Sequence, residues 1–270
     1  MNLHRRRCLT GLPSKRYMPS YNRGIKRVSY TLIFFLILSG LATASPASGA
    51  SGAQGDIRSL VSRIIAAYGG KEVVGGIRSI YAAGKIEAFM RHDHGTYEVC
   101  FKRPRKLRVA TEYRRSSEIR ILNGDRGYRG TDNGPLSEAG GDSLLAMVYQ
   151  YKHFDLPYGL MEGSYSVSVK GKEDLLHGKP VEVLHLTDGE GPPMDVYVDT
   201  HDFFIVKVTG YFTVGDRSTA LSAEFSDFRK VDGTVFPFRI MNYAGGYKIA
   251  ETVMRVYRLN PAIPDSLFAP

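Results

Sequence analysis

Two short runs of histidine and aspartate contain the residue types best able to ligate a metal ion. The first is His92-Asp93-His94, in which the two imidazoles would share one face of an extended strand. A zinc site needs three or four such ligands, and no other His or Cys lies nearby in the sequence. Gly95 follows directly and marks a turn. We therefore predict a polar hairpin tip here and no metal site.

The second run is Asp199-Thr200-His201-Asp202, which separates two segments with strand-like alternation. Asp-Thr-x-Asp is ordinary turn composition, because short polar side chains bond to nearby backbone amides. We interpret it as a turn. His185 lies in the middle of a predicted strand, where a hydrogen-bonded sheet residue is the simplest interpretation.

Local catalytic signatures are absent. The sequence has no Gly-x-Ser-x-Gly, no phosphate loop ending in Gly-Lys-Ser/Thr, no Gly-x-Gly-x-x-Gly after a strand, no His-Glu-x-x-His and no Cys-x-x-Cys. A site assembled from distant residues would need polar strand residues such as Glu98, His185 and Glu224 to point inwards together. We predict that the protein is not an enzyme and uses no cofactor.

A basic cluster has two interpretations that the sequence leaves open. It comprises Arg103, Arg105, Lys106 and Arg108, with Arg114 and Arg115 beyond it. Charge commonly guards the edge strand of a sheet, so a solvated edge is one interpretation. The other is a cavity mouth that meets an acidic head group or partner.

The overall charge argues against a nucleic-acid partner. The formal net charge of the 270 residues is +9, but the first 50 residues hold eight of the 36 Lys and Arg and no acid. Residues 51–270 therefore balance 28 bases against 27 acids. A nearly neutral domain has no net field that attracts a polyanion.

The basic N-terminal region has the anatomy of a signal peptide. An apolar run of 15 residues, 30–44, follows it and is shorter than the ~20 residues that span a bilayer. Small residues then permit cleavage after Ala44 or after Ala50. Because the basic region is unusually long, we suspect that translation starts at Met18. We expect residues 1–50 to be removed and residues 51–270 to form a single periplasmic domain.

The cysteines indicate neither a lipid anchor nor a disulfide. Leu41 stands where a lipobox requires Cys, and Cys8 lies in the basic region. The mature chain keeps only Cys100, so no intrachain disulfide can form. We expect Cys100 to be a small strand residue, because no basic pocket or His partner is evident around it.

Helical periodicity is confined to two segments. Apolar residues recur at i, i+3, i+4 and i+7 from Ile57 to Tyr68, which predicts a helix capped by Asp56 and ended by Gly69-Gly70. A second helix is expected over residues 143–154. Residues 45–55 are rich in Ser, Gly and Ala and are expected to be disordered. Residues 132–141 are expected to form a polar loop.

The rest of the mature chain alternates as strands do. Residues 220–240 are typical: Leu221 and Phe225 share an apolar face, Asp232-Gly233 makes a turn, and Phe236 and Phe238 resume the alternation. Pro237 cannot donate to a ladder, so its strand should bend or lie at an edge there. We expect strands over residues 80–90, 96–103, 107–113, 118–122, 167–170, 181–187, 194–199, 205–212, 220–228, 234–243 and 247–259, and a turn at residues 123–125 that leads the chain towards residues 127–129.

Even strand spacing predicts a mainly β protein with a few helices, an α+β class. Its curved antiparallel sheet would form a half-open barrel of about 11 strands, by the strand count above. Two helices are few for so large a sheet, and most of its 30 Tyr and Phe lie in strands. The surplus apolar face must be closed by curling, by a ligand or by a partner. A curled sheet with an unfilled interior encloses an apolar cavity.

Four segments resemble a known family. They are the Gly-rich residues 67–86, the Lys-Arg-Pro-Arg-Lys-Leu-Arg run at 102–108, the Val-Asp-Gly-Thr-Val-Phe-Pro-Phe-Arg-Ile run at 231–240 and the Leu-Asn-Pro-Ala-Ile-Pro-Asp-Ser-Leu-Phe run at 259–268. In this order they are similar to the LolA/LolB-type periplasmic outer-membrane lipoprotein-sorting proteins. The resemblance implies a half-open barrel with lid helices over an apolar cavity. In the carriers of that family the cavity takes lipoprotein acyl chains, and Arg108 is the nearest counterpart of their functional arginine.

These observations together predict a monomeric periplasmic binding or carrier protein for lipoprotein acyl chains or another lipid, without a lipid anchor. The expected protein partner is an inner-membrane transporter or another envelope protein. A mobile lid would comprise the second helix and residues 133–135 and 156–159. An envelope sensor or protein-interaction module with the same fold is the alternative, and an enzyme using the cavity is the third. The cavity-lining residues that we predict are Phe89, Tyr97, Val99, Phe101, Arg108, Val196, Val198, Phe225, Phe236 and Phe238.

Overall fold

A computed structural model describes residues 49–131, 134–176, 178–214 and 217–270. The predicted start at Met18, the cleavage site after Ala44 and the Leu41 position of the lipobox lie outside these residues. The alternative cleavage site after Ala50 falls in the first turn of a helix. No helix within the described ranges is long and apolar enough to cross a membrane.

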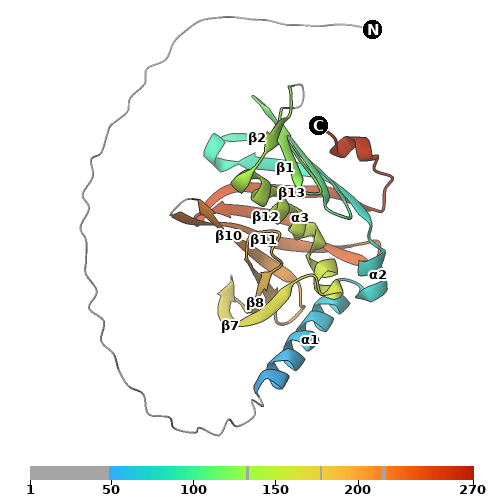
Figure 1. Ribbon diagram of the computed structural model, residues 1–270, viewed down its shortest axis with the longest axis vertical. Coiled ribbons are helices and arrows are strands. Elements are labelled where there is room, and N and C mark those ends of the chain that lie inside the picture. The colour runs from blue at the N-terminus through green and yellow to red at the C-terminus, as the bar shows by residue number, and fades with distance from the viewer. Residues whose placement is uncertain (1–48, 132–133, 177, 215–216) are drawn as a thin grey trace, which may run out of the picture. The chain divides into compact units, whose positions relative to one another are not determined.

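One antiparallel sheet accounts for every strand in the described part of the chain (Figure 1). Its 13 strands exceed the predicted number because the sheet also takes up short segments that sequence alternation does not mark. The strands are β1 (Ser79–Ala88), β2 (Asp93–Lys102), β3 (Lys106–Tyr113), β4 (Ser117–Asn123), β5 (Arg126–Gly130), β6 (Ser137–Ala139), β7 (Ser166–Leu176), β8 (Lys179–Thr187), β9 (Met194–Asp199), β10 (Ile205–Val214), β11 (Arg217–Val231), β12 (Thr234–Ala244) and β13 (Tyr247–Leu259).

The first and last strands pair in the middle of the sheet. The spatial order is β6-β5-β4-β3-β2-β1-β13-β12-β11-β10-β9-β8-β7, and Ile80 of β1 faces Leu259 of β13. Two meanders therefore run outwards from a central β1–β13 seam, and the sheet ends at β6 and β7 without closing. The predicted class, a curved and half-open antiparallel sheet with a few helices, is confirmed.

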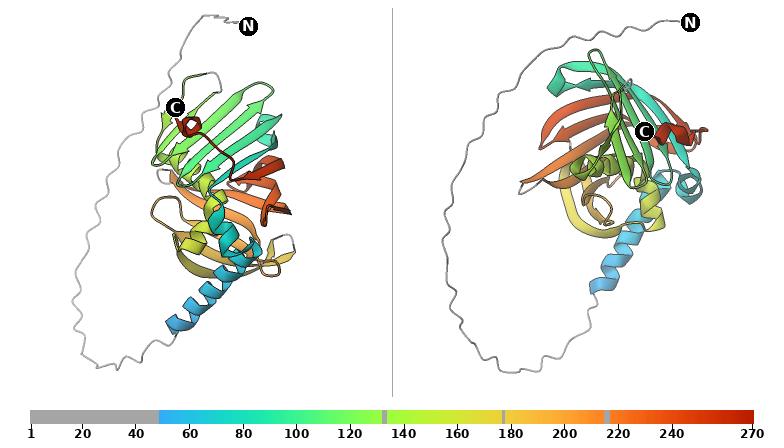
Figure 2. Two further views of the ribbon diagram at one scale, coloured as in Figure 1. Left: turned by 90° about the vertical axis from the view of Figure 1, so that its right-hand side faces the viewer. Right: turned by 45° about the horizontal axis from the view of Figure 1, so that its top comes forward.

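Across the described residues, three α-helices accompany the sheet: α1 (Gly49–Ala67), α2 (Gly70–Gly76) and α3 (Gly141–Glu162). Two 3-10 turns, η1 (Phe89–Arg91) and η2 (Asp265–Phe268), complete the elements. Figure 2 shows α3 crossing the concave side of the sheet between the two meanders. It packs against both halves, because residues such as Met147 and Val148 join one core cluster and Tyr149 and Leu156 join the other.

Several predicted boundaries are wrong. Asp56 does not cap α1, because the Ala- and Ser-containing residues before it continue the helix back to Gly49 and are not disordered. α3 runs on past Phe154 to Glu162 and includes residues 156–159, so Pro157 lies inside the helix. Residues 137–139 of the predicted polar loop form β6 against β5. The Gly-Gly stop after α1 is correct, and α2 follows it at once.

The β11–β12 hairpin forms as predicted. Asp232 and Gly233 both have positive φ, 46° and 88°, which is the backbone of a type I′ turn. The ladder between β12 and β13 begins only at Arg239, so β12 parts from β13 at Pro237. The predicted opening at Pro237 is confirmed, although β12 is an interior strand of the sheet.

Both faces of the sheet are partly covered. On the concave face lie the helices and the two largest apolar clusters. η2 lies on the convex face beside the C-terminus (Figure 2). Its Phe268 is fully buried against a cluster that includes Cys100, Ile119 and Ile121. Burial raises the pKa of the Cys100 thiol, as fits the predicted small strand residue.

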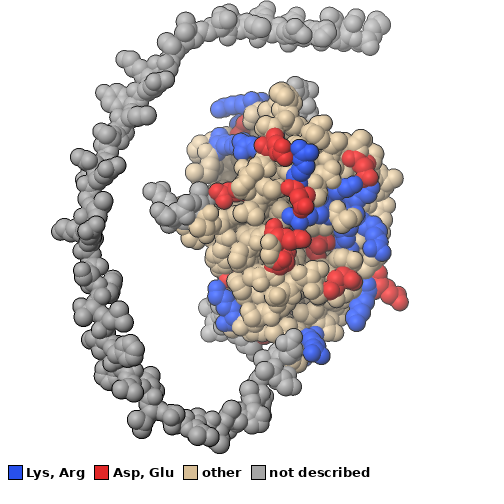
Figure 3. Space-filling view, viewed as in Figure 1, with Lys and Arg blue, Asp and Glu red and all other residues tan. Residues whose placement is uncertain are grey.

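Charges of both signs are interspersed on the face shown in Figure 3. This mixture agrees with the near balance of bases and acids in residues 51–270. The basic cluster does not guard an edge, because β3 lies between β2 and β4. Three of its members pair with carboxylates: Arg105 with Glu190, Lys106 with Asp265 and Arg108 with Glu98.

Tyr149 anchors α3 to the sheet. Its ring packs on Gly210 of β10, where an added Cβ would meet the ring at 2.7 Å. Its hydroxyl lies 2.9 Å from the carbonyl oxygens of Val208 and Leu221 and shares its proton between them. The helix is therefore held by a polar contact that bridges two neighbouring strands.

Tyr149→Phe is expected to lower the free energy of unfolding by about 1–2 kcal/mol, since it removes a buried hydrogen bond to two strand carbonyls. Urea unfolding followed by circular dichroism measures this loss. Tyr247 is 76% exposed, so Tyr247→Phe is the matched control and should change nothing measurable. A Tyr149→Phe protein as stable as the wild type would contradict the anchoring role.

Candidate ligand cavity

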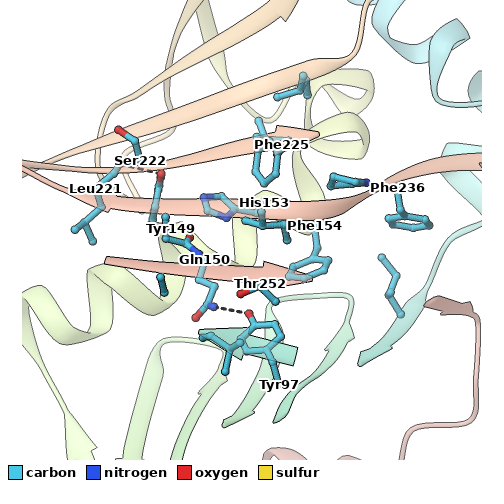
Figure 4. Close-up of a pocket in the computed structure, with 18 of the residues that line it drawn as sticks. Tyr97, Tyr149, Gln150, His153, Phe154, Leu221, Ser222, Phe225, Phe236 and Thr252 are labelled. Carbon is cyan, nitrogen blue, oxygen red and sulfur yellow. Dashed lines mark hydrogen bonds between the residues drawn. The ribbon is translucent and has the colours of Figure 1, made fainter. Parts of the chain in front are cut away.

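A cavity of about 470 Å³ lies between α3 and the concave face of the sheet (Figure 4). Its walls come from both meanders and from the helix, so residues far apart in sequence meet there. The residues at its centre include Tyr97 of β2, Phe225 of β11, Phe236 of β12, Thr252 of β13 and the α3 residues Gln150, His153 and Phe154.

The lining is mainly apolar and aromatic. Phe236 stacks on Tyr257 with ring centroids 4.4 Å apart, and Tyr257 donates to the carbonyl of Pro237 at 2.7 Å. This bond crosses the place where β12 parts from β13. The opening at Pro237 thus becomes part of the cavity wall, with aromatic rings filling the gap between the two strands.

A few polar groups interrupt the apolar lining. Gln150 donates to the hydroxyl of Tyr97 at 3.0 Å (Figure 4). Burial raises the pKa of that hydroxyl, and the charge of Arg120 opposes the rise. His153 lies edge-on to Tyr149 and Phe225, at centroid distances of 4.4 and 5.6 Å. Its Nε2 is buried and has no hydrogen-bond partner.

Burial lowers the pKa of His153 to about 4, so the ring is neutral near pH 7. An unfolded chain takes up this proton near pH 6.5, and the folded protein does not until about pH 4. Stability must therefore fall as the pH drops through this window, by up to about 3 kcal/mol from this residue alone.

His153→Phe is expected to remove that contribution while keeping a ring between Tyr149 and Phe225. Urea unfolding at pH 7 and at pH 4.5 measures it: the wild type should lose about 2–3 kcal/mol more than the variant between the two conditions. Equal losses in both proteins would show that His153 is not a buried neutral histidine.

Arg103, directly after β2, closes the cavity where α2 and α3 meet the sheet. Its Nε donates to Asp155 at 2.7 Å, its Nη1 donates to the carbonyl of Ile77 at 2.5 Å, and its guanidinium stacks on Tyr158 at 3.5 Å from the ring centroid. Only 9% of its side chain is exposed. Arg103 is thus the one residue of the basic cluster that borders the cavity, and its guanidinium is already bound to Asp155, Ile77 and Tyr158.

The structure places the ten predicted lining residues in five different environments. Tyr97, Phe225 and Phe236 border the cavity. Val99, Phe101 and Phe238 are buried in the cluster behind it, and Val196 and Val198 in the second cluster. Phe89 lies half-buried in η1. Arg108 pairs with Glu98 at 3.4 Å, beside the bond from Tyr81 to Glu98. A ligand-binding role stays a prediction for all ten.

Sequence reasoning missed the residues of α3 and Arg120. Arg120 alternates with Ile119 and Ile121, and such a pattern normally places the isoleucines inside. Here η2 covers the convex face, so the isoleucines are buried there and Arg120 borders the cavity. For α3 the sequence did contain a signal. Within the predicted second helix, the residues that border the cavity recur at helical spacing and share one face: Tyr149, Gln150, His153 and Phe154.

The histidine and aspartate runs serve local structure. Asp93 accepts from Arg114 at 3.0 Å and from the amide of His94, and Asp199 accepts from the amide of His201 at the predicted turn. His185 bonds to Asp195 at 2.8 Å. Over the described ranges no three His, Cys, Asp or Glu side chains gather to hold a metal ion. Glu98, His185 and Glu224 have separate partners and do not converge.

Solved structures share this architecture. A DUF1329 family protein from Desulfovibrio piger is 12% identical with a TM-score of 0.52, covering 78% of this chain and 96% of that one. A LolA superfamily protein from Nitrosomonas europaea is 15% identical with a TM-score of 0.51, covering 79% and 97%. An outer membrane lipoprotein-sorting protein domain from Vibrio parahaemolyticus is 13% identical with a TM-score of 0.51, covering 78% and 95%.

These likenesses show the fold, and they confirm at that level the resemblance seen in the sequence motifs. No family model and no curated protein matches the sequence. The chain therefore has the fold of the LolA superfamily.

Proposed function

We propose that this chain, with its LolA-type fold, is a non-enzymatic carrier or binding protein that holds acyl chains in the cavity under α3. The ligand would be the acyl chains of a lipoprotein or a free lipid. The observation that carries the proposal is the apolar cavity itself, which is bordered by aromatic residues such as Phe154, Phe225 and Phe236. We further propose that the basic leader directs the chain to the periplasm and is then removed.

The size and chemistry of the cavity support an acyl ligand. Its volume of about 470 Å³ lies within the range of small-molecule sites, about 300–1,000 Å³. Each methylene group moved from water into such a lining gains about 0.8 kcal/mol. A bound acyl chain would therefore fill space that the side chains leave open and would add to the stability of the folded protein.

A carrier must also release its ligand, and α3 is the element that would have to move. It crosses the concave face, supplies Gln150, His153 and Phe154 to the cavity and is held to the strands by Tyr149. Pro157 interrupts the hydrogen bonds of the helix within the segment that lines the cavity. We propose that the whole of α3 is the lid. The lid expected from the sequence was a shorter helix flanked by separate segments, but residues 156–159 belong to α3 itself.

Native mass spectrometry of the gently purified full chain tests this function. We expect a co-purifying mass that organic extraction removes, and a delipidated protein that then binds a fluorescent fatty acid. A ligand-free spectrum together with no fatty-acid binding would refute the carrier function. If a pull-down then recovered one stoichiometric envelope protein, a sensor or interaction module would take its place.

A further inference from the structure

The cavity has a one-sided charge. Among its lining residues in the described part of the chain are three arginines, Arg91, Arg103 and Arg120, and no Asp or Glu. Arg103 is neutralised by Asp155 at 2.7 Å. Arg91 is more than half exposed and lies 3.7 Å from Glu118. Arg120 is half-buried and forms no ion pair or hydrogen bond with any described residue, so no carboxylate of the described part of the chain neutralises it.

Unsatisfied polar atoms also gather at the cavity. Buried polar atoms almost always have a hydrogen-bond partner, so exceptions call for an explanation. Within the described ranges four buried side-chain atoms lack one: Arg105 Nε, Arg120 Nε, Gln150 Oε1 and His153 Nε2. The last three belong to residues that line the cavity. A polar group or ordered water held in the cavity would satisfy these three groups, which all border the same space.

Arg120 is placed to receive an anion beside an apolar wall. It comes from β4 on the concave side, and its charge acts on the hydroxyls of Tyr97 and Tyr113, which also line the cavity. A guanidinium offers a planar fork of donors that fits a carboxylate or phosphate in a bidentate manner. Gln150, bonded to Tyr97, adds a second polar group among the aromatic residues that would surround a chain (Figure 4).

We infer that the ligand is an anionic amphiphile, whose acyl chain lies along the aromatic wall and whose carboxylate or phosphate head group binds Arg120. This inference rests on the proposed carrier function and narrows it. Acyl groups linked as esters or amides carry no charge and would leave the guanidinium unpaired. A free fatty acid or a lipid with a terminal phosphate would satisfy it.

The test compares ligands with one chain and different ends. Lauric acid, dodecyl phosphate and uncharged methyl laurate are titrated into the delipidated full chain by calorimetry at neutral pH. A charge-assisted hydrogen bond contributes about 1.5–3 kcal/mol, so we expect at least one anion to bind about tenfold or more tightly than the ester. The stronger of the two anions identifies the head-group class.

Arg120→Gln is expected to abolish the preference for the anionic ligands without lowering the affinity for methyl laurate. Arg120→Lys keeps the charge and should retain most of it. Arg255→Gln makes the same chemical change at an exposed residue of β13 and should leave every affinity unchanged. Circular dichroism and a melting curve confirm that each variant folds.

Three outcomes would overturn the inference. If the wild type bound the ester and both anions equally tightly, the inferred anionic head group would be refuted and the proposed carrier function would stand. Equal weakening of acid and ester by Arg120→Gln would assign Arg120 a structural role. Absence of binding for all three compounds would refute the carrier function itself, and the inference with it.

Discussion

Arg103→Met is expected to lower the free energy of unfolding by about 3–5 kcal/mol, the usual cost of removing one partner of a buried ion pair. The guanidinium joins three elements: it follows β2, donates to Asp155 of α3 and donates to the carbonyl of Ile77 after α2. Methionine fills similar space but makes none of these bonds. It leaves a carboxylate whose side chain is only 16% exposed without its cation.

The position of Arg103 makes the loss cooperative. Burial raises the pKa of Asp155, and the Arg103 charge is the main group that opposes this rise. The guanidinium also stacks on Tyr158 in the last turns of α3. Without it, the end of α3 and the end of α2 lose their common attachment to the sheet.

Urea unfolding followed by circular dichroism measures the effect, and two further variants assign it. Arg103→Lys keeps the charge but loses the planar fork, so its stability should lie between the wild type and Arg103→Met. Adding Asp155→Leu to Arg103→Met removes the unpaired charge and should recover part of the loss. If the double variant were less stable than Arg103→Met, the buried carboxylate would not be the cause.

Arg120 is expected to affect folding stability in the opposite direction from Arg103, although both residues are arginines. It has no carboxylate partner in the described structure, and its Nε is buried and unsatisfied. Arg120 is only half-buried, and in the proposed complex the anionic head group would offset the cost of placing this cation beside an apolar wall. The two arginines therefore separate a structural role from a binding role. The sequence alone could not separate them, since Arg103 belonged to a conspicuous cluster and Arg120 did not.

The fold could be predicted largely from local patterns. Alternation at residues 220–240 with Asp232-Gly233 between the strands specifies a hairpin, because few other structures bury one face and accept positive φ at that place. Repetition of this unit predicts an antiparallel sheet. What local patterns do not contain is the pairing of β1 with β13, which joins Ile80 to Leu259 and places β3 inside the sheet.

The candidate site could be predicted only in part, for a related reason. Alternation shows which residues share a face but not whether one or both faces are covered. Phe225 and Phe236 border the cavity, as the alternation in their hairpin predicts, because the face that they share is the one that α3 crosses. Ile119 and Ile121 share a face with Cys100 under η2, and this contact between distant segments turns Arg120 inwards. The polar residues of α3 depend in turn on where the helix crosses the sheet.

Thr252→Phe is expected to weaken fatty-acid binding by about tenfold or more. The new ring would fill cavity space that about one to two methylene groups of the bound fatty acid would otherwise occupy. Thr252 of β13 is buried, lies between Phe154 and Tyr97 and faces the cavity (Figure 4). Because the ring enters open space and not a packed core, the loss of folding stability should stay near 1 kcal/mol. Titration of lauric acid into the delipidated protein measures the affinity.

Val253→Phe is the matched control, because Val253 is the next residue on β13, is also β-branched and is 39% exposed on the other face. It should bind lauric acid as the wild type does. Similar weakening in both variants would point to a general distortion of β13. Normal affinity in a folded Thr252→Phe protein would place the acyl chain elsewhere and would remove the cavity under α3 as the binding site.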